Sequence, residues 1–575
     1  MLKTSPKFSA RAVGARYTPF EMHTVLLNPL AHTSDKERGA VYTKREVVAA
    51  ILDLIGYSPC VALSELSILE PCCGKGDFLL PIVERLLASY LQRGGEPRFA
   101  YEALKNSIRA AEISGRSHNA AGMMVSELLE AHRIPSADAT RLVEAWFIHA
   151  DFLLVPLPSG FDFIVGNPPY LRQERIPDSL LVEYRRRFRT LYDRADIYVP
   201  FIERSLNLLK PGGQLSFICS DRWMKNRYGG PLRNMVSQGF HLKHVLSVND
   251  VPAFTQEVIA YPAIFVIENA IGNKPTKIAV PPKTLDELRA TVDVMSNDAT
   301  HPIELFREMR NVVCDDQPWL TDANAHVAMI RRMELEYPTL EQAGCRVGIG
   351  VATGADGVFI GPYDALDVEE ERKVPLVGTK DIYSGSVEWK GRGVVNPFEP
   401  DGSVAELERY PRFRRFVESN EVLLRRRNVA QRSGRAWYRT IDRIYIELVA
   451  TPKLLIPDIK GTANVVYEEG RFYPHHNLYY VTSKTWDLRA LQAVLRSRLF
   501  RLFITAYSLR MQGGYLRFQA QYLRRLRLPK WETVSLAMRE KLASAACSGN
   551  AMACDAATAE LFRLDDSELL TLQLF

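Results

Sequence analysis

Phe161-Asp162-Phe163-Ile164-Val165-Gly166-Asn167-Pro168-Pro169-Tyr170 is the stretch that decides the fold. Its first six residues are mainly apolar, which predicts a buried strand. Two prolines then stiffen the loop that follows, so the loop presents an amide, Asn167, and an aromatic ring, Tyr170. A buried strand that ends in a rigid polar loop indicates a sheet whose ligand lies at the carboxyl ends of its strands.

Apolar runs alternate with helical patterns on both sides of this stretch. Strands are expected near 66–70, 108–113, 147–152, 214–219, 245–248 and 263–267, and helices near 44–55, 78–87 and 116–131. Thr43 is the expected N-cap of the first of these helices. The alternation over 39–270 predicts an α/β fold with an open, doubly wound sheet.

A chain of 575 residues is too long for one hydrophobic core. From Val347 onward the pattern changes to short strands, turns, aromatic residues and many arginines, which predicts a separate, mixed α+β domain. We expect an N-terminal arm at 1–38, the α/β domain at 39–270, a connecting segment at 271–340, the mixed domain at 341–530 and a helical tail at 531–575.

Composition excludes several classes of protein. No apolar run approaches the roughly 20 residues that cross a bilayer, and the N-terminus lacks the apolar core of a signal peptide, so a cytoplasmic location is expected. The eight cysteines form no C-x-x-C pair, which argues against a zinc site or a disulfide framework. His475 and His476 have no third ligand at helical spacing, so we expect a surface turn and no metal.

A glycine-containing loop, Glu70-Pro71-Cys72-Cys73-Gly74-Lys75-Gly76, follows the strand expected near 66–70. It is neither the dinucleotide fingerprint nor a phosphate-binding P-loop. Its glycines let the backbone approach a ligand closely, while Glu70 and Asp77 disfavour phosphate. A cationic nucleoside without phosphate fits better, and S-adenosylmethionine is one.

Two further acids lie near the ends of the next strands. Glu112 is placed to accept hydrogen bonds from ribose hydroxyls, as an acid does in dinucleotide folds. Asp151 could accept from the exocyclic amine of the cofactor. Any one of these features could be an ordinary turn glycine or surface acid. Three acids at successive strand ends favour a cofactor site.

The loop from Asn167 to Tyr170 suits the methylation of a planar amine. Such an amine is a poor nucleophile, because its lone pair is delocalised, and two acceptors aimed at its N–H bonds would stabilise the positive charge that develops on nitrogen. The Asn167 side-chain carbonyl and the Pro168 backbone carbonyl can supply them, and Tyr170 offers a face for stacking. No covalent nucleophile is required, and alignment does the remaining work.

In their order, these motifs resemble the gamma-type N6-adenine DNA methyltransferases that carry a TaqI-like C-terminal specificity domain. The matching stretches are Val41–Lys44, Glu70–Phe78, Asn167–Tyr170, Leu208–Gly213, Ala253–Val258 and Ile349–Gly354. The resemblance implies a Rossmann-like S-adenosylmethionine-dependent domain, a flipped-out adenine and a contact between Phe254 and that base. It places the cofactor among Tyr42, Thr43, Glu70, Pro71, Gly74, Gly76, Glu112, Asp151 and Asn167.

The mixed domain carries an arginine-rich segment that suits DNA. Between Arg409 and Arg443 eleven arginines face only three acids, Glu418, Glu421 and Asp442. Arginine forks bind phosphates and guanine edges alike. A solvated helix face is the alternative for such a run, but the excess of one charge favours nucleic acid. The expected DNA contacts are Arg412, Arg415, Arg425, Arg426, Arg427 and Arg435.

The sequence therefore predicts a site-specific DNA adenine-N6 methyltransferase of a restriction–modification or related defence system. Double-stranded DNA is its partner, and residues 1–38 leave no room for an N-terminal nuclease, so a cognate endonuclease would be encoded separately. The alternative reactions are methylation of a glutamine amide in protein, methylation of RNA and methylation of cytosine N4. A non-catalytic DNA-binding specificity subunit is an alternative of another class.

Overall fold

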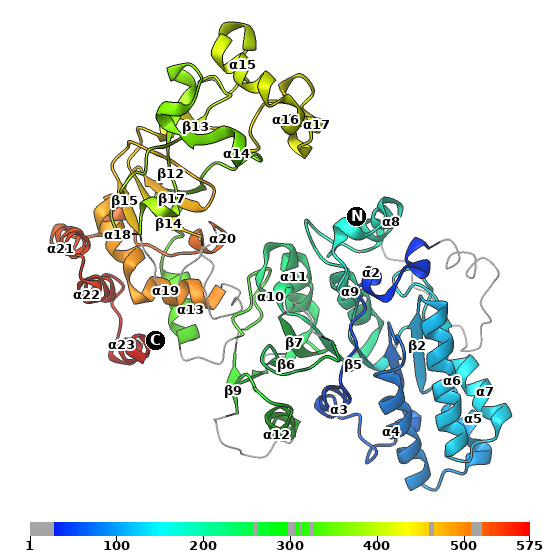
Figure 1. Ribbon diagram of the computed structural model, residues 1–575. Helices are drawn as coiled ribbons and strands as arrows, with labels where there is room; N and C mark the ends of the chain where they lie inside the picture. Colours follow the sequence, from blue (N-terminus) through cyan, green and yellow to red (C-terminus); the bar gives the residue numbers. More distant parts are fainter. Residues whose placement is uncertain are drawn as a thin grey trace, which may run out of the picture. The chain divides into compact units, whose positions relative to one another are not determined.

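The computed structural model describes residues 28–256, 261–272, 274–296, 305–310, 312–321, 326–383, 385–458, 465–507 and 520–574. It divides into two compact units, Met1–Ala323 and Asn324–Phe575 (Figure 1). The boundary falls within 271–340, the segment that the sequence predicts to be a connection. Most of the expected N-terminal arm, residues 1–27, lies outside the described residues.

The first unit is built on a nine-stranded sheet with the order β3-β2-β1-β4-β5-β7-β6-β8-β9. The strands β3, β2, β1, β4 and β5 are parallel, and β7 is antiparallel to both β5 and β6. The strands are β1 Ile68–Glu70, β2 Ile108–Glu112, β3 Phe147–His149, β4 Phe161–Gly166, β5 Leu209–Ser220, β6 His241–Ser247, β7 Pro262–Glu268, β8 Thr276–Ala279 and β9 Phe306–Met309.

Both faces of this sheet are buried under helices (Figure 1). In β4, Ile164 packs into one core, whereas Phe163 and Val165 pack into the other. One face is covered by α3 Arg45–Leu54, α4 Leu79–Gln92, α6 Gly115–Ala131, α7 Ser136–Trp146 and α12 Leu285–Ser296, the other by α8 Asp178–Arg187, α9 Tyr198–Leu208 and α11 Gly230–Gly239. Burial on both sides explains why the parallel strands are nearly continuous apolar runs.

The strand order reverses at β1, which lies between β2 and β4. Ile68 of β1 pairs with Ile108 on one side and with Phe163 on the other. Because all three strands are parallel, the glycine loop after β1, the acid at the end of β2 and the Asn167 loop after β4 emerge at one edge of the sheet. A strand-order reversal of this kind forms the ligand-binding crevice of open α/β sheets.

The predicted α/β class is confirmed, and local features differ from the expectation. Lys44, not Thr43, is the N-cap of α3, and it makes no side-chain cap hydrogen bond. The segment 271–340 is more than a connection, since β8 and β9 pair at the edge of the sheet and α12 packs in the first unit's core. β3 ends at His149, so Asp151 lies two residues beyond its strand.

The second unit contains two four-stranded sheets, β10-β17-β14-β15 and β11-β13-β12-β16. The strands are β10 Cys345–Ile349, β11 Ile360–Pro362, β12 Lys373–Val377, β13 Arg392–Val395, β14 Lys453–Pro457, β15 Val466–Glu468, β16 Tyr473–Pro474 and β17 Leu478–Ser483. The consecutive strands β16 and β17 belong to different sheets. The short connection between them therefore links the two sheets.

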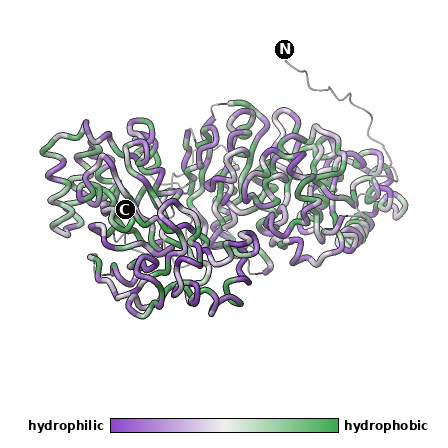
Figure 2. Tube along the Cα trace, turned by 90° about the horizontal axis from the view of Figure 1, so that it is seen from above, coloured by the Kyte–Doolittle hydropathy of each residue, from purple (hydrophilic) through white to green (hydrophobic). Residues whose placement is uncertain are grey.

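Helices complete the second unit. They are α13 His326–Glu336, α14 Asp356–Phe359, α15 Pro411–Ser419, α16 Glu421–Arg425, α17 Asn428–Ser433, α18 Leu488–Arg496, α19 Arg498–Tyr507, α20 Ala520–Leu523, α21 Leu536–Cys547, α22 Ala551–Leu561 and α23 Asp566–Leu574. The last three lie within residues 531–575. Hydrophobic and hydrophilic residues alternate along the chain (Figure 2), and none of the described helices is long and apolar enough to span a membrane.

A buried ion pair in the second unit generates a stability prediction. Lys453 of β14 pairs with Glu468 of β15, both side chains are almost fully buried, and Lys453 Nζ also donates to the Phe472 carbonyl at 3.1 Å. Lys453→Ala should destabilise this unit by about 3–5 kcal/mol, because it leaves an unpaired buried carboxylate. Chemical denaturation followed by circular dichroism measures the change in the free energy of unfolding.

The double variant Lys453→Met, Glu468→Leu is the matched control. Two apolar side chains of similar volume should recover most of the stability, because neither leaves a buried charge. Equal stability of the single and double variants would contradict the prediction.

Candidate active site

The glycine loop is held in place by the carboxylate that ends β2. Glu112 accepts the Gly74 N–H through Oε2 and the Ser114 N–H through Oε1, both at 2.8 Å. Gly74 and Gly76 have φ angles of +52° and +98°, in the left-handed region that favours glycine. The loop between β1 and α4 is thus fixed from two sides, by its glycine geometry and by a neighbouring strand end.

A pocket opens at this edge of the sheet. The expected cofactor residues that line it are Tyr42, Thr43, Glu70, Pro71, Gly74, Glu112, Asp151 and Asn167. Gly76 is not among the lining residues, and its contribution is the shape of the loop. The structure therefore brings together residues that span more than one hundred positions of sequence.

The pocket is rich in buried carboxyl groups. Burial raises the pKa of Glu70, Asp77, Glu112 and Asp151 above their ordinary values, and the charges of Asp77 and Glu112 raise that of Glu70 further. Within the described part of the chain, Glu70 Oε2 is buried with no hydrogen-bond partner. Such a pocket disfavours phosphate and favours a ligand that brings hydrogen-bond donors or positive charge.

Asn167 is fixed in one orientation. Its Nδ2 donates to the Val41 carbonyl at 3.0 Å and to Thr43 Oγ1 at 3.1 Å. A backbone carbonyl can only accept, so the amide nitrogen must face Val41 and the amide oxygen must face the other way. That oxygen, Oδ1, is buried and has no partner among the described residues. Asn167 therefore presents an unused acceptor beside the pocket.

Aromatic rings gather next to this acceptor. The Tyr170 ring meets the Phe254 ring edge to face, with centroids 6.4 Å apart, and the centroid of the Tyr198 ring lies 6.3 Å from that of Tyr170. Phe254 is held beside Thr43 by backbone hydrogen bonds from Lys44 to Ala253 and from Thr255 to Tyr42, both 3.0 Å. Residues 257 and 258 of the matching stretch lie outside the described residues. Pro168, Tyr170 and Phe254 do not line the pocket itself.

Residues that precede the α/β domain also shape the pocket, and the sequence pattern did not predict them. Leu30 and Arg38 line the pocket, and Asn28 Nδ2 donates to Asp151 Oδ2 at 2.8 Å. Tyr184 also donates to Asp151 Oδ2, at 2.6 Å. The sequence holds one signal for this region, because Ser34-Asp35-Lys36-Glu37 forms a capping box that starts α2 (Asp35–Arg38). It places Arg38 at the end of that helix, beside the pocket.

The expected DNA contacts of the second unit fall into two groups. Arg427 donates to the carbonyls of Leu424, Thr353 and Trp437, so its guanidinium links three backbone segments and stabilises the fold. Arg412 pairs with Asp367, and Arg425 pairs with Glu421. Exposed side chains that make no ion pair within the described residues form the second group, which comprises Arg415, Arg426 and Arg435.

Comparison with known proteins gives the family. The family model described as Eco57I restriction-modification methylase matches residues 101–254, and the model described as TaqI-like C-terminal specificity domain matches residues 377–528. The chain is 49% identical to the type II methyltransferase M.XhoI of Xanthomonas vasicola, over 92% of this chain and 98% of that protein. The chain belongs to the type II methyltransferases.

Two other type II methyltransferases also align with this chain over most of their length. The type II methyltransferase M.PaeR7I of Pseudomonas aeruginosa is 50% identical over 92% of each chain, and M.BstVI of Geobacillus stearothermophilus is 39% identical over 93% of this chain and 98% of its own. The solved structure of the type IIL restriction-modification enzyme MmeI has the same fold, with a TM-score of 0.59, 12% identity, and coverage of 89% of this chain and 72% of that one.

The predicted family and its TaqI-like specificity domain are thereby confirmed. This methyltransferase is a site-specific DNA-modifying enzyme of the restriction–modification class. The comparisons do not favour a glutamine-amide methyltransferase, an RNA methyltransferase or a non-catalytic subunit.

A close backbone contact behind the Asn167 loop generates the next prediction. The Gly39 carbonyl accepts the Tyr170 N–H at 2.9 Å, and a Cβ on Gly39 would lie 2.6 Å from the Tyr170 carbonyl group. Gly39→Ala should therefore displace the loop of the methyltransferase. We expect kcat of methyl transfer to fall tenfold or more, because displacements of about 1 Å can cost about 100-fold.

Gly56→Ala is the matched control. Gly56 has φ +74°, close to the +72° of Gly39, but a Cβ there meets nothing within 4 Å. Both variants carry the same backbone strain, and only Gly39→Ala adds the clash with Tyr170. Equal kcat values for the two variants, measured as methyl incorporation into DNA, would contradict the prediction.

Proposed function

We propose that the chain transfers the methyl group of S-adenosylmethionine to N6 of an adenine in double-stranded DNA. The observation that carries the proposal is the buried, unpartnered Oδ1 of Asn167 next to a carboxyl-rich pocket in the described part of the chain. A lone acceptor of this kind suits the N–H group of an amine whose nitrogen becomes positively charged in the transition state.

The hydrogen-bond acceptors that line the pocket fit S-adenosylmethionine. When bound, this cofactor supplies an electrophilic methyl group on a sulfonium centre. Glu112 retains lone pairs for the ribose hydroxyls although both of its oxygens already accept backbone N–H groups. Asp151 can accept from the adenine amine, and Ile113 and Phe152 supply apolar walls. The excess of buried carboxylates complements the positive charge of the ligand.

The chain's own residues would orient the target amine. Asn167 Oδ1 accepts one of its N–H groups and the Pro168 carbonyl accepts the other, which stabilises developing charge without a covalent intermediate. Tyr170 stacks on the target base, and Phe254 contacts it from the side. Thr43 and Val41 keep the Asn167 amide from rotating. Most of the rate acceleration then comes from alignment of nitrogen and methyl group.

An adenine within a duplex cannot reach such a site, so the base would be extruded. Extrusion needs a protein surface that holds the duplex, and the exposed arginines of the second unit offer one. We propose Arg415, Arg426 and Arg435 as direct DNA contacts. A separately encoded endonuclease would cut the same sequence when it is unmethylated. We propose a cytoplasmic location for the enzyme, where it would meet cellular DNA.

Substitution of Asn167 tests the chemistry. Asn167→Ala should lower methylation of duplex DNA by about 1,000-fold, the upper range for loss of one transition-state hydrogen bond, while the cofactor Kd changes little. Calorimetric titration with S-adenosylmethionine measures the Kd, and mass spectrometry of digested DNA identifies the product. N4-methylcytosine in place of N6-methyladenine would overturn the proposed substrate, and full activity of the variant would overturn the mechanism.

Thr43→Val is the matched control for that experiment. It removes an acceptor of the Asn167 Nδ2 but leaves Oδ1 and the Val41 carbonyl in place. An intermediate loss of kcat is expected, because the amide is held by one hydrogen bond in place of two. A loss as large as that of Asn167→Ala would show that orientation, and not the acceptor itself, dominates.

Substitutions in the two groups of arginines should have different effects, one on DNA binding and the other on stability. Alanine at Arg415, Arg426 and Arg435 should weaken duplex binding and reduce the slope of log K against log salt by roughly 0.9 for each phosphate that is no longer neutralised. Arg427→Ala should instead lower the melting temperature, because three backbone carbonyls lose their donor. Arg471→Ala is the control, since this exposed arginine already pairs with Glu469. An unchanged salt slope in the triple variant would remove these arginines from the interface.

A further inference from the structure

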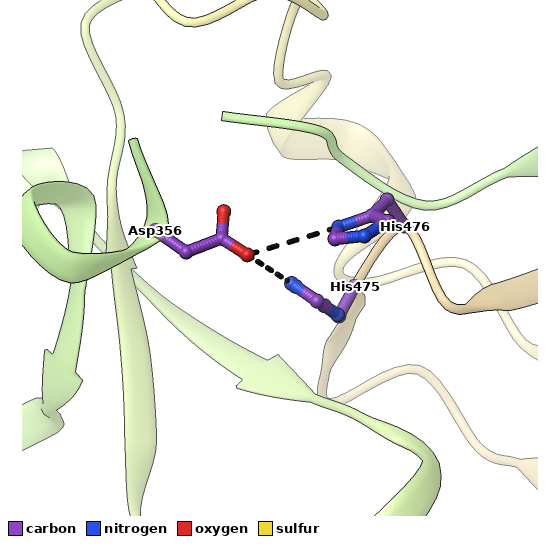
Figure 3. A group of neighbouring side chains, drawn as sticks. All are labelled: Asp356, His475 and His476. Carbon is purple, nitrogen blue, oxygen red and sulfur yellow. Dashed lines mark hydrogen bonds and ion pairs between the residues drawn. The ribbon is translucent and has the colours of Figure 1, made fainter. Parts of the chain in front are cut away.

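The second unit contains a cluster of three side chains that come from outside the arginine-rich segment Arg409–Arg443. Asp356, His475 and His476 point toward one another (Figure 3). Asp356 Oδ2 lies 3.1 Å from His475 Nε2 and 3.9 Å from His476 Nδ1. One potential ligand atom from each residue lies within 4.8 Å of the others. The cluster thus offers two imidazole nitrogens and one carboxylate oxygen to a common point.

The backbone holds these side chains at defined positions. Asp356 is the first residue of α14, and its other oxygen, Oδ1, accepts the Thr353 hydroxyl at 2.5 Å. Oδ2 is thereby directed at the histidines. His475 N donates to the Val377 carbonyl at 2.8 Å, and His476 N donates to the Val351 carbonyl at 3.0 Å. Both histidines lie in the connection from β16 to β17, which links the two sheets.

We propose that Asp356, His475 and His476 bind one zinc ion. Imidazole and carboxylate ligands suit zinc, whereas Mg²⁺ and Ca²⁺ prefer oxygen ligands alone. At bond lengths of about 2.0–2.1 Å, the ligands of a tetrahedral zinc ion are roughly 3.4 Å apart. The two separations from Asp356 Oδ2, 3.1 Å and 3.9 Å, bracket that value, and all three ligand atoms lie within 4.8 Å of one another, so rotation of the side chains would bring the ligands to a common ion. Water would take the fourth position.

The ion would crosslink segments that adjoin the two sheets. Asp356 leads through α14 directly into β11 of one sheet, and the histidines precede β17 of the other. The sequence predicts no metal because no third ligand stands near His475 and His476, and Asp356 supplies that ligand from 119 residues away. Asp442, whose Oδ2 accepts the Ala352 N–H at 2.9 Å, adds negative charge beside the site. Zinc binding should therefore stabilise the second unit.

Zinc titration of the full-length protein against a chromophoric chelator tests the proposal. The exposed cysteines Cys60, Cys314 and Cys547 are alkylated first, so that thiols do not compete. We expect one equivalent of zinc per chain and a rise in the melting temperature on its addition. His476→Ala should weaken binding at least tenfold and remove the thermal shift. The His476 side chain is 46% exposed, so this variant should fold.

His132→Ala is the matched control, because it removes a histidine of the first unit and should leave zinc binding unchanged. Asp356→Ala should weaken binding as His476→Ala does. If the cluster is only a histidine–aspartate ion pair, the wild-type protein should bind no more zinc than the variants, and zinc should not raise its melting temperature. Either of these two findings would overturn the site, and so would equal zinc affinity in wild type and His476→Ala.

Discussion

The hydrogen bonds from Asn167 Nδ2 to the Val41 carbonyl and to Thr43 Oγ1 are the constraint on which the site depends. They join the loop after β4 to the segment that leads into α3, and the hydrogen bond between Gly39 and Tyr170 joins the same two segments a second time. Because these partners use the amide nitrogen, the amide oxygen is left buried and without a partner among the described residues. The orientation of the amide is thus defined by the hydrogen bonds of its nitrogen.

Much of the fold and of the pocket follows from local sequence. The apolar runs of β1, β2 and β4 are buried on both faces, so they are recognisable without any knowledge of the topology. Gly74 and Gly76 indicate a tight loop, and the rigid Asn167–Tyr170 segment indicates a strand end. Parallel pairing then forces these stretches to one edge of the sheet, which is why Glu70, Glu112 and Asp151 can be predicted as pocket residues from sequence alone.

Features that rest on distant partners cannot be predicted in this way. Thr43 is the expected N-cap because a hydroxyl before a helix usually has that role, but its Oγ1 accepts from Asn167 instead. Asn28 contacts Asp151 across 123 residues, and Asp356 reaches His475 across 119. Short edge strands such as β8 and β9 have too few apolar residues for a clear pattern, so the sequence of 271–340 predicts only a connection.

The three carbonyl bonds of Arg427 have a consequence for how such a protein can diverge. An arginine that serves as scaffold is not available to contact a ligand, and its replacement disturbs the surrounding chain. No such backbone contact is made by the exposed side chains of Arg415, Arg426 and Arg435 within the described residues, so a change at any of them alters the surface without altering the framework. A new binding surface can therefore evolve on this unit by substitution of its solvent-facing residues, with the architecture beneath them held constant.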